Sequence, residues 1–291
     1  MAIAFRSSSS AFAQATSVVV TKPAGVVNGD VLVAVALSDG AAVTPPAGWS
    51  GITGGGALNM YYKTAASEPA NYTWTTSANN IISAIISAYS GATGVVDKSN
   101  VTGSGSSTTP TAVAITTTNN NEMIVWAAAN GVITDETTDS CPSAMTKRQD
   151  IEASYFDGFV NQYTHLWLGD AVLAIAGLTN STFNNGSSTP SHTWAASILS
   201  LIPAITSNIV TIPLGTLTLQ ALIPVINIAQ SIVVPLGTMT LQGLQIQIQG
   251  IKMVIPLGTL TLRGLILDWI GVIPVLPHVP NIFLPKPPGY Y

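Results

Sequence analysis

The chain has 291 residues, of which 47% are hydrophobic and only 8% are charged, and its formal net charge is −4. This apolar, weakly charged composition excludes intrinsic disorder, since disordered chains are rich in net charge and poor in apolar residues. No run reaches the roughly 18 consecutive apolar residues that a membrane-spanning helix requires. Nine Lys and Arg residues, spread along the chain, make no basic stripe for nucleic acid.

Short runs of β-branched and aromatic residues, separated by Gly, Pro, Asn and Ser, fill residues 1–202. They predict strands at residues 17–21, 30–37, 59–63, 72–75 and 81–89, the last of which also fits a buried helix. No amphipathic helical windows alternate with these runs. We therefore expect an all-β fold in which residues 1–202 form an antiparallel β-sandwich domain.

A faint internal similarity relates two parts of this domain. Residues 27–37 and residues 120–129 each begin with a polar turn, continue with an acidic residue and end in an apolar strand. Each half also finishes with a strand that contains a tryptophan, Trp74 in one and Trp194 in the other. The similarity indicates two related sheets that face one another.

The composition changes near Ile202, and the region that follows contains a repeat. The motif Pro-Leu-Gly-Thr, followed by alternating apolar residues and Thr, occurs at residues 212–219, 234–241 and 255–262. A unit of about 21 residues buries too little apolar surface to stand alone, so the units must stack on each other, on copies in sister chains, or on both. We expect residues 203–271 to form a three-copy β-repeat region, a short stalk that oligomerises.

The alternation within each repeat selects the residues of the oligomer interface. Period two places leucine on one face of the strand and threonine on the other, and leucine gains about 2 kcal/mol on burial. We expect the leucine face to turn towards an oligomer axis, most simply a threefold axis. The expected interface residues are Leu217, Leu219, Met239, Leu241, Leu260 and Leu262.

Prolines recur through residues 272–291 and exclude a helix or a central strand there. This composition predicts an extended tail with much polyproline II conformation. Its apolar side chains would need a groove on a neighbouring subunit or on another protein.

Candidate catalytic residues are few. A Ser-His-Asp site can be drawn from the serine-rich segment 103–107 with His165 and Asp170, but the Gly-x-Ser-x-Gly elbow is absent and the segment is typical of a flexible loop. Cys141 is the single cysteine, and we interpret it as a structural thiol rather than a nucleophile. We expect no catalytic residue and no cofactor.

A cluster of acidic residues follows in the middle of the chain. Its members are Asp135, Glu136, Asp139, Asp150, Glu152 and Asp157. We interpret the cluster as a solvated acidic loop with Lys147 and Arg148 as ion-pair partners. Calcium binding and a carboxylate pair for glycoside hydrolysis are the alternatives, and neither has a matching spacing, so we assign no metal site.

Tryptophan and tyrosine side chains could stack on sugar rings or fill the core. The residues concerned are Trp49, Tyr61, Tyr62, Tyr72, Trp74, Trp126 and Trp194. Aromatic residues at alternating strand positions favour core packing and cross-strand pairs. We therefore expect them to lie in the core.

The sequence resembles proteins of tailed bacteriophages in two places. The repeat at residues 212–219 and its two copies resemble short repeats near the ends of minor phage structural proteins. Residues 22–34, together with residues 45–49 and 62–65, are similar to a β-sandwich module of phage fibre and decoration proteins. The resemblance implies a β-rich, non-enzymatic virion component, often trimeric, displayed on the capsid or tail.

We therefore expect a structural protein on the exterior of a phage particle, either capsid decoration or cement, or a head fibre. Its localisation would be the virion, assembled in the host cytoplasm. Its partners would be two further copies of the chain and other proteins of the capsid or tail. The alternative is a tail fibre or tail-tip protein that binds a host-surface glycan.

Overall fold

The computed structural model describes two compact units, Met1–Ala204 and Ile205–Tyr291. The described residues are 2–38, 41–52, 58–131, 138–156, 161–204, 209–211, 215–220, 231–233, 237–242, 245–249, 252–254, 258–263 and 266–270. Strands account for 68% of the structure and helix for 2%, which confirms the predicted all-β fold. Among the described residues, no helix is long and apolar enough to cross a membrane.

The first sheet of the N-terminal unit is antiparallel and is built from residues before position 91. Its strands are β1 (Ala4–Thr21), β2 (Val31–Ser38), β3 (Val43–Thr44), β4 (Ser50–Gly51), β5 (Leu58–Thr64) and β6 (Asn71–Ser90). The order is β1-β6-β2-β5-β4, and β3 pairs with β6. The two predicted strands at 72–75 and 81–89 both lie within β6, so the segment that also fitted a helix is a strand.

The second sheet is also antiparallel and uses the rest of the unit. Its strands are β7 (Ala92–Ser107), β8 (Glu122–Asn130), β10 (Thr146–Phe156), β11 (Asn161–Leu173) and β13 (His192–Pro203), in the order β10-β11-β8-β13-β7. A small separate sheet joins β9 (Thr138–Ser140) to β12 (Ser187–Thr189), next to the short helix α1 (Ser181–Asn184). The prediction of a flexible loop at 103–107 is wrong, because this segment pairs with β13 as part of β7.

The two sheets repeat one topology. Written as β1-β6-β2-β5-β4 and β7-β13-β8-β11-β10, the two orders place corresponding strands at the same position in the sheet and in the same sequence along the chain. Residues 27–37 and 120–129 contain β2 and β8, the central strands of the two sheets. The faint similarity in sequence therefore corresponds to a repeated structural unit.

The repetition includes the turn before each central strand. The carboxylates of Asp30 and Glu122 each accept a hydrogen bond from the backbone N–H three residues earlier, at 2.9 and 2.8 Å. The residue before each acid has a positive φ, +91° at Gly29 and +59° at Asn121. Glycine and asparagine tolerate this conformation best. Each turn thus carries its own acceptor for an otherwise unpaired N–H group.

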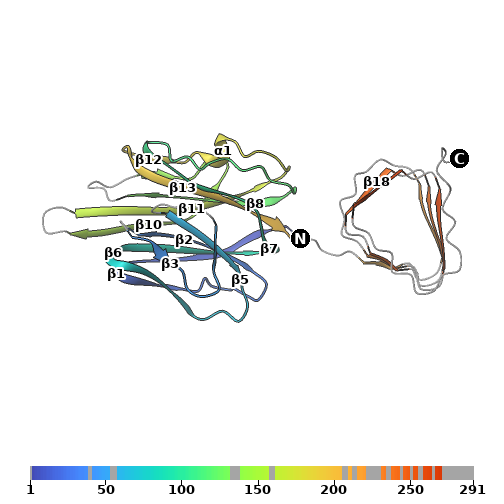
Figure 1. Ribbon diagram of the computed structural model, residues 1–291, viewed down its shortest axis with the longest axis horizontal. Helices are drawn as coiled ribbons and strands as arrows, with labels where there is room; N and C mark the ends of the chain where they lie inside the picture. Colours follow the sequence, from blue (N-terminus) through green and yellow to red (C-terminus); the bar gives the residue numbers. More distant parts are fainter. Residues whose placement is uncertain are drawn as a thin grey trace, which may run out of the picture. The chain divides into compact units, whose positions relative to one another are not determined.

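Apolar side chains fill three layers in this unit. A central cluster between the sheets contains residues of both, such as Val33 and Ile85 of the first and Val125 and Leu168 of the second. Two further clusters cover the outer faces of the two sheets. Figure 1 shows the sheets as two layers. Because both faces are covered, β2 and β8 are buried along their whole length and read as continuous apolar runs.

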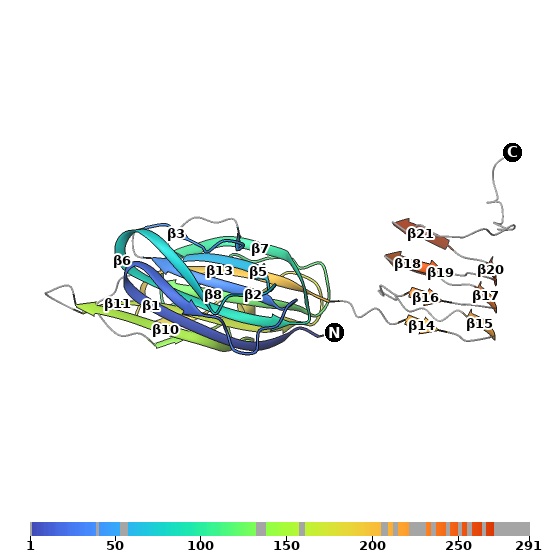
Figure 2. The ribbon, with the colours of Figure 1, turned by 90° about the horizontal axis from the view of Figure 1, so that it is seen from below.

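The C-terminal unit contains three parallel sheets whose strands come from successive repeats. The sheets are β14 (Ile209–Thr211), β16 (Ser231–Val233) and β19 (Lys252–Val254); β15 (Gly215–Gln220), β17 (Gly237–Gln242) and β20 (Gly258–Arg263); and β18 (Gln245–Gln249) with β21 (Ile266–Ile270). Figure 2 shows the strands of each sheet stacked in order. Each full repeat supplies one strand to each sheet, which is the arrangement of a β-solenoid.

The stacking is in register. Leu217 pairs with Met239, which pairs with Leu260, and Leu219, Leu241 and Leu262 align in the same way. The repeats therefore stack on each other within one chain, one of the arrangements that the sequence left open. The assignment of these six residues to an oligomer interface stays a prediction, and residues 272–291 lie outside the described part of the chain.

Candidate functional site

His165 lies between two carboxylates in the second sheet. It faces Glu152 directly across the β10–β11 pairing, and β9 brings Asp139 to its other side. Nδ1 is 3.0 Å from an oxygen of Asp139, and Nε2 is 3.1 Å from an oxygen of Glu152. A neutral imidazole can donate from only one nitrogen, so this arrangement suits the protonated, charged form.

The electrostatics agree with this geometry. Burial alone lowers the pKa of His165, but the hydrogen bond and charge of Asp139, with the charges of Glu152 and Asp150, raise the pKa above its usual value. The cluster therefore acts as an ion-pair bridge between β9 and the second sheet.

The structure does not assemble the Ser-His-Asp site drawn from the sequence. Segment 103–107 lies in β7, which is separated from β11, the strand of His165 and Asp170, by β8 and β13. Asp170 contacts Arg148 instead. Asp139 and His165 do form an acid–histidine pair, but the Nε2 atom that a nucleophile would need faces Glu152.

The prediction of an acidic loop is wrong for the members that the structure describes, because all three lie in strands, although Asp150 and Glu152 are exposed to solvent as expected. Asp139 lies in β9 and is buried, while Asp150 and Glu152 lie in β10. Lys147 pairs with Asp150 at 2.6 Å, as an ion-pair partner of the cluster. In the described part of the chain no group of three His, Cys, Asp or Glu side chains could hold a metal ion. Asp135, Glu136 and Asp157 lie outside the described residues.

Arg148 and Asp170 form a second polar cluster at the edge where the two sheets meet. The Arg148 guanidinium contacts both carboxylate oxygens of Asp170, at 2.9 to 3.0 Å, and Asp170 is almost fully buried. The ring of Phe5 in β1 lies under the guanidinium, 4.4 Å from its central carbon. Burial and the charge of Asp170 raise the pKa of Tyr89, a residue of β6, well above its usual value.

These contacts connect β10 of the second sheet to β1 and β6 of the first. The side chain of Gln149 also donates a hydrogen bond to the Ser10 hydroxyl in β1, at 2.6 Å. The sequence offers no signal for this cluster beyond the isolated charges, because its members are far apart in the chain.

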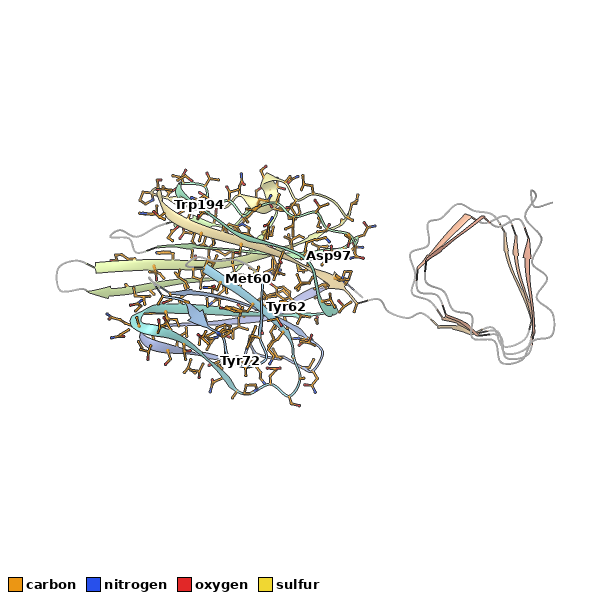
Figure 3. The ribbon with its side chains drawn as sticks, viewed as in Figure 1. Met60, Tyr62, Tyr72, Asp97 and Trp194 are labelled. Atoms are coloured by element: carbon orange, nitrogen blue, oxygen red, sulfur yellow. The ribbon has the colours of Figure 1, made fainter. Side chains whose placement is uncertain are left out.

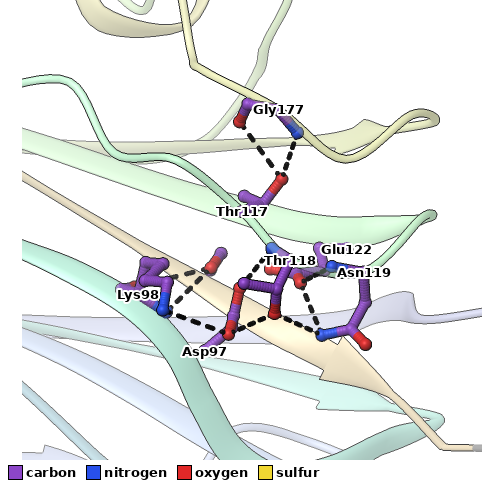
Figure 4. Close-up of polar contacts among 8 residues, drawn as sticks. Asp97, Lys98, Thr117, Thr118, Asn119, Glu122 and Gly177 are labelled. Carbon is purple, nitrogen blue, oxygen red and sulfur yellow. Dashed lines mark hydrogen bonds and ion pairs between the residues drawn. The ribbon is translucent and has the colours of Figure 1, made fainter.

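A third cluster contains two carboxyl groups, those of Asp97 in β7 and Glu122 at the start of β8. Figure 4 shows them with Lys98 and the turn formed by Thr118 and Asn119. Asp97 accepts hydrogen bonds of 2.7 Å from both the backbone N–H and the hydroxyl of Thr118. Glu122 is buried and accepts bonds from the backbone and side-chain N–H groups of Asn119. Sequence analysis did not connect these two acids, which are 25 positions apart.

The aromatic side chains are mainly in the core, as the sequence predicted. The ring of Trp74 packs against those of Trp49 and Tyr61, with ring centroids 5.3 and 5.2 Å apart. The buried members of the predicted set are Trp49, Tyr61, Tyr72, Trp74, Trp126 and Trp194. Figure 3 shows Tyr72 on the side of the first sheet and Trp194 on the side of the second. In the described residues these rings therefore form no open platform for sugar stacking.

Cys141 is consistent with a structural thiol. Burial is the main cause that raises the pKa of its thiol to about 12, so the reactive thiolate is scarce at neutral pH. A side chain at Gly169 in β11 would overlap the Cys141 sulfur, which shows how closely the two segments pack.

Comparison with protein-family models, curated proteins and solved structures gives no match for this chain. The features of the chain that bear on its function are therefore its fold, these three polar clusters and the residues of the sequence itself.

Proposed function

We propose that the chain is a non-enzymatic structural protein on the exterior of a phage particle, acting as capsid decoration or as a head fibre. The in-register stacking of the Pro-Leu-Gly-Thr repeats carries this proposal. A parallel stack of this kind is a stiff, extended element with no chemistry of its own, which suits a scaffold displayed on a particle. The resemblance of the same repeats to those of phage structural proteins supports it.

The polar clusters of the N-terminal unit also support a structural role. Buried titratable groups of the described residues, such as His165, Asp170 and Glu122, bind other side chains or turns of the same unit. The low charge of the C-terminal region favours contacts with other protein surfaces. We propose that these contacts are made with further copies of the chain and with other virion proteins.

The alternative of a glycan-binding tail protein has less support. It would use exposed aromatic rings beside a carboxylate pair, whereas six of the seven candidate rings are buried. The acid pair of Asp97 and Glu122 is itself inside the second half of the unit, where a sugar would have no access to Glu122.

The proposal is tested on purified particles from a host that carries the gene. Quantitative mass spectrometry should find many copies of the chain per particle, and antibodies against the N-terminal unit should label the capsid surface in electron micrographs. A few copies confined to the tail would favour the glycan-binding alternative. Absence of the chain from particles would overturn both assignments.

A further inference from the structure

The repeated topology places Arg6 and Asp97 at equivalent positions. Each follows a residue that pairs with the next strand, Phe5 in β1 or Val96 in β7, and each lies at a shift in register. In each sheet, the strand residue that pairs with Phe5 or Val96 also pairs, on its other side, with a residue of the central strand. That central-strand residue directly follows the acid of the turn, Asp30 in the first sheet and Glu122 in the second. In both sheets the irregular position in the first strand therefore points to the same acidic turn.

The two equivalent positions carry opposite charges. In the first sheet, the Arg6 guanidinium lies 2.7 Å from the carboxylate of Asp30 and neutralises it. In the second sheet, a carboxyl group, that of Asp97, takes the place of the guanidinium and faces Glu122. The second sheet thus keeps the architecture of the ion pair but replaces the cation with a second acid.

Nothing in the surroundings of Glu122 balances a second negative charge. Its Oε1 atom accepts both hydrogen bonds from Asn119, while its Oε2 atom is buried without a well-oriented donor among the described residues. Among the described residues, the other charged groups at this site are Asp97 and Lys98. The Lys98 ammonium is 3.8 Å from a carboxylate oxygen of Asp97, and the Lys98 side chain is 44% exposed. Ser200 of β13 contributes only a hydroxyl group.

Two like charges held together in a buried site favour the retention of one proton. Burial raises the pKa of Glu122, and the adjacent Asp97 raises it further, which outweighs the hydrogen bonds from Ser200 and Asn119. Although burial of Asp97 acts in the same direction, the hydrogen bonds from Thr118 lower its pKa overall. The proton therefore belongs on Glu122, which can donate it to the carboxylate of Asp97.

We propose that Asp97 and Glu122 share one proton in the folded protein, and that loss of this proton at higher pH loosens the turn at residues 117–122. The first sheet has no such response, because Arg6 occupies the position of Asp97. The turn also holds another segment, since the Thr117 hydroxyl exchanges two hydrogen bonds with the backbone of Gly177, at 3.0 and 3.3 Å (Figure 4). The backbone N–H of Thr117 donates a third bond to the Gly177 carbonyl, at 2.9 Å. Ile175 and Leu178, on either side of that glycine, are 76% and 68% exposed.

The direction in which stability changes with pH follows from the linkage between proton binding and folding. In the unfolded chain Glu122 loses its proton near pH 4.3, whereas the folded state keeps it to higher pH. Its contribution is therefore fully present below the unfolded pKa and is lost as the pH rises through the folded pKa. In that interval the folding equilibrium constant should fall by about tenfold per pH unit, for one proton.

The direct test is infrared spectroscopy of the full chain, which detects the carbonyl stretch of a protonated carboxyl group. In a titration from acidic pH upwards, the wild type should keep one such band to higher pH than ordinary exposed carboxyl groups do, and Glu122→Gln should lack this late band. Absence of the late band from wild-type protein would overturn the proposal whatever the variants do.

Hydrogen exchange measures the structural consequence. The amides of Thr118, Asn119 and Gly177 should exchange faster above the transition in the wild type, but at a pH-independent opening equilibrium in Glu122→Gln, which keeps the shape of the side chain without the charge. Asp30→Asn is the matched control in the first sheet, and it should weaken its own turn without removing the response at residues 117–122. A response that persists in Glu122→Gln would contradict the assignment.

Discussion

At the scale of single residues, the N-terminal unit depends on buried charges that are paired across strands. Three residues compensate buried charge in different ways: His165 through a protonated imidazole, Arg148 through a bidentate ion pair, and Glu122 through a shared proton. Each costs desolvation, and each becomes strongly unfavourable once a partner is removed.

Arg148→Ala should destabilise the protein by about 3–5 kcal/mol, because it leaves the carboxylate of Asp170 buried without its partner. Its neighbour provides the control. Lys147→Ala removes an ion pair with Asp150 that is well exposed on both sides, and it should cost less than about 1 kcal/mol. Urea denaturation of the two variants measures the difference, and equal losses would show that Asp170 does not need the guanidinium.

His165 should make stability depend on pH. Because its folded pKa is raised, the stabilisation is fully present below the unfolded value of about 6.5 while the carboxylates are ionised, and it is lost as the pH rises through the folded pKa. His165→Gln should therefore lose about 1–3 kcal/mol near pH 6 and less near pH 9. Denaturation curves at the two pH values check this, and a loss that is the same at both would exclude a charged histidine.

At the scale of elements, close packing around β7 explains why its sequence contains glycine at positions where a side chain would not fit. A Cβ atom at Gly103 would overlap the backbone oxygen of Thr111, and one at Gly105 would lie 2.8 Å from the ring of Trp194. The segment after β7 folds back over the strand, and only glycine leaves room for it.

Gly103→Ala should destabilise the unit by more than about 1 kcal/mol, because the added methyl group collides with backbone that cannot rotate away. Gly131→Ala is the control, since a Cβ atom there has its nearest neighbour at 4.0 Å. Thermal unfolding of both variants gives the comparison. A Gly103→Ala protein as stable as Gly131→Ala would mean that the strand and the covering segment are not in contact.

The same strand shows what the sequence could and could not predict. The apolar strands β2 and β8 were predictable, because apolar runs of strand length that are bounded by turn residues favour buried strands. Segment 103–107 was not, since glycine and serine mark both flexible loops and crowded strands. The pairs Asp97–Glu122 and Arg148–Asp170 depend on strand order and on local shifts in register, which residue composition does not encode. The repeat period did encode the stacking of the C-terminal strands, but not their parallel, in-register geometry.

At the scale of the whole molecule, the prediction concerns the number of chains that assemble. We expect a homotrimer, and native mass spectrometry of the full chain at micromolar concentration should find that mass. The variants Leu241→Asn and Thr240→Asn, on opposite faces of β17 by strand alternation, form a matched pair. Only the leucine variant should lower the oligomer mass, and a stable monomeric wild type would contradict the prediction.

Deletion of residues 272–291 should weaken assembly or attachment to the particle, because these proline-rich residues offer apolar side chains to a partner without pairing as a strand. Native mass and particle incorporation of the shortened chain check this. Unchanged assembly and incorporation would show that the tail makes no needed contact.

In-register stacking also means that the length of the C-terminal unit can change only in steps of one repeat. Gly215, Gly237 and Gly258 align, although the sequence spacing between the first two differs by one residue from that between the last two. The stack therefore accepts small differences in repeat length without losing register. Each further repeat would add one strand spacing, about 4.8 Å, and one more nearest-neighbour interface. Insertion of a second copy of residues 234–254 should therefore raise the melting temperature of this unit, measured by calorimetry, whereas a lower one would show that the repeats do not add independently. Lineages that carry this chain could thus adjust the reach of the unit by duplication alone, while its cross-section stays the same.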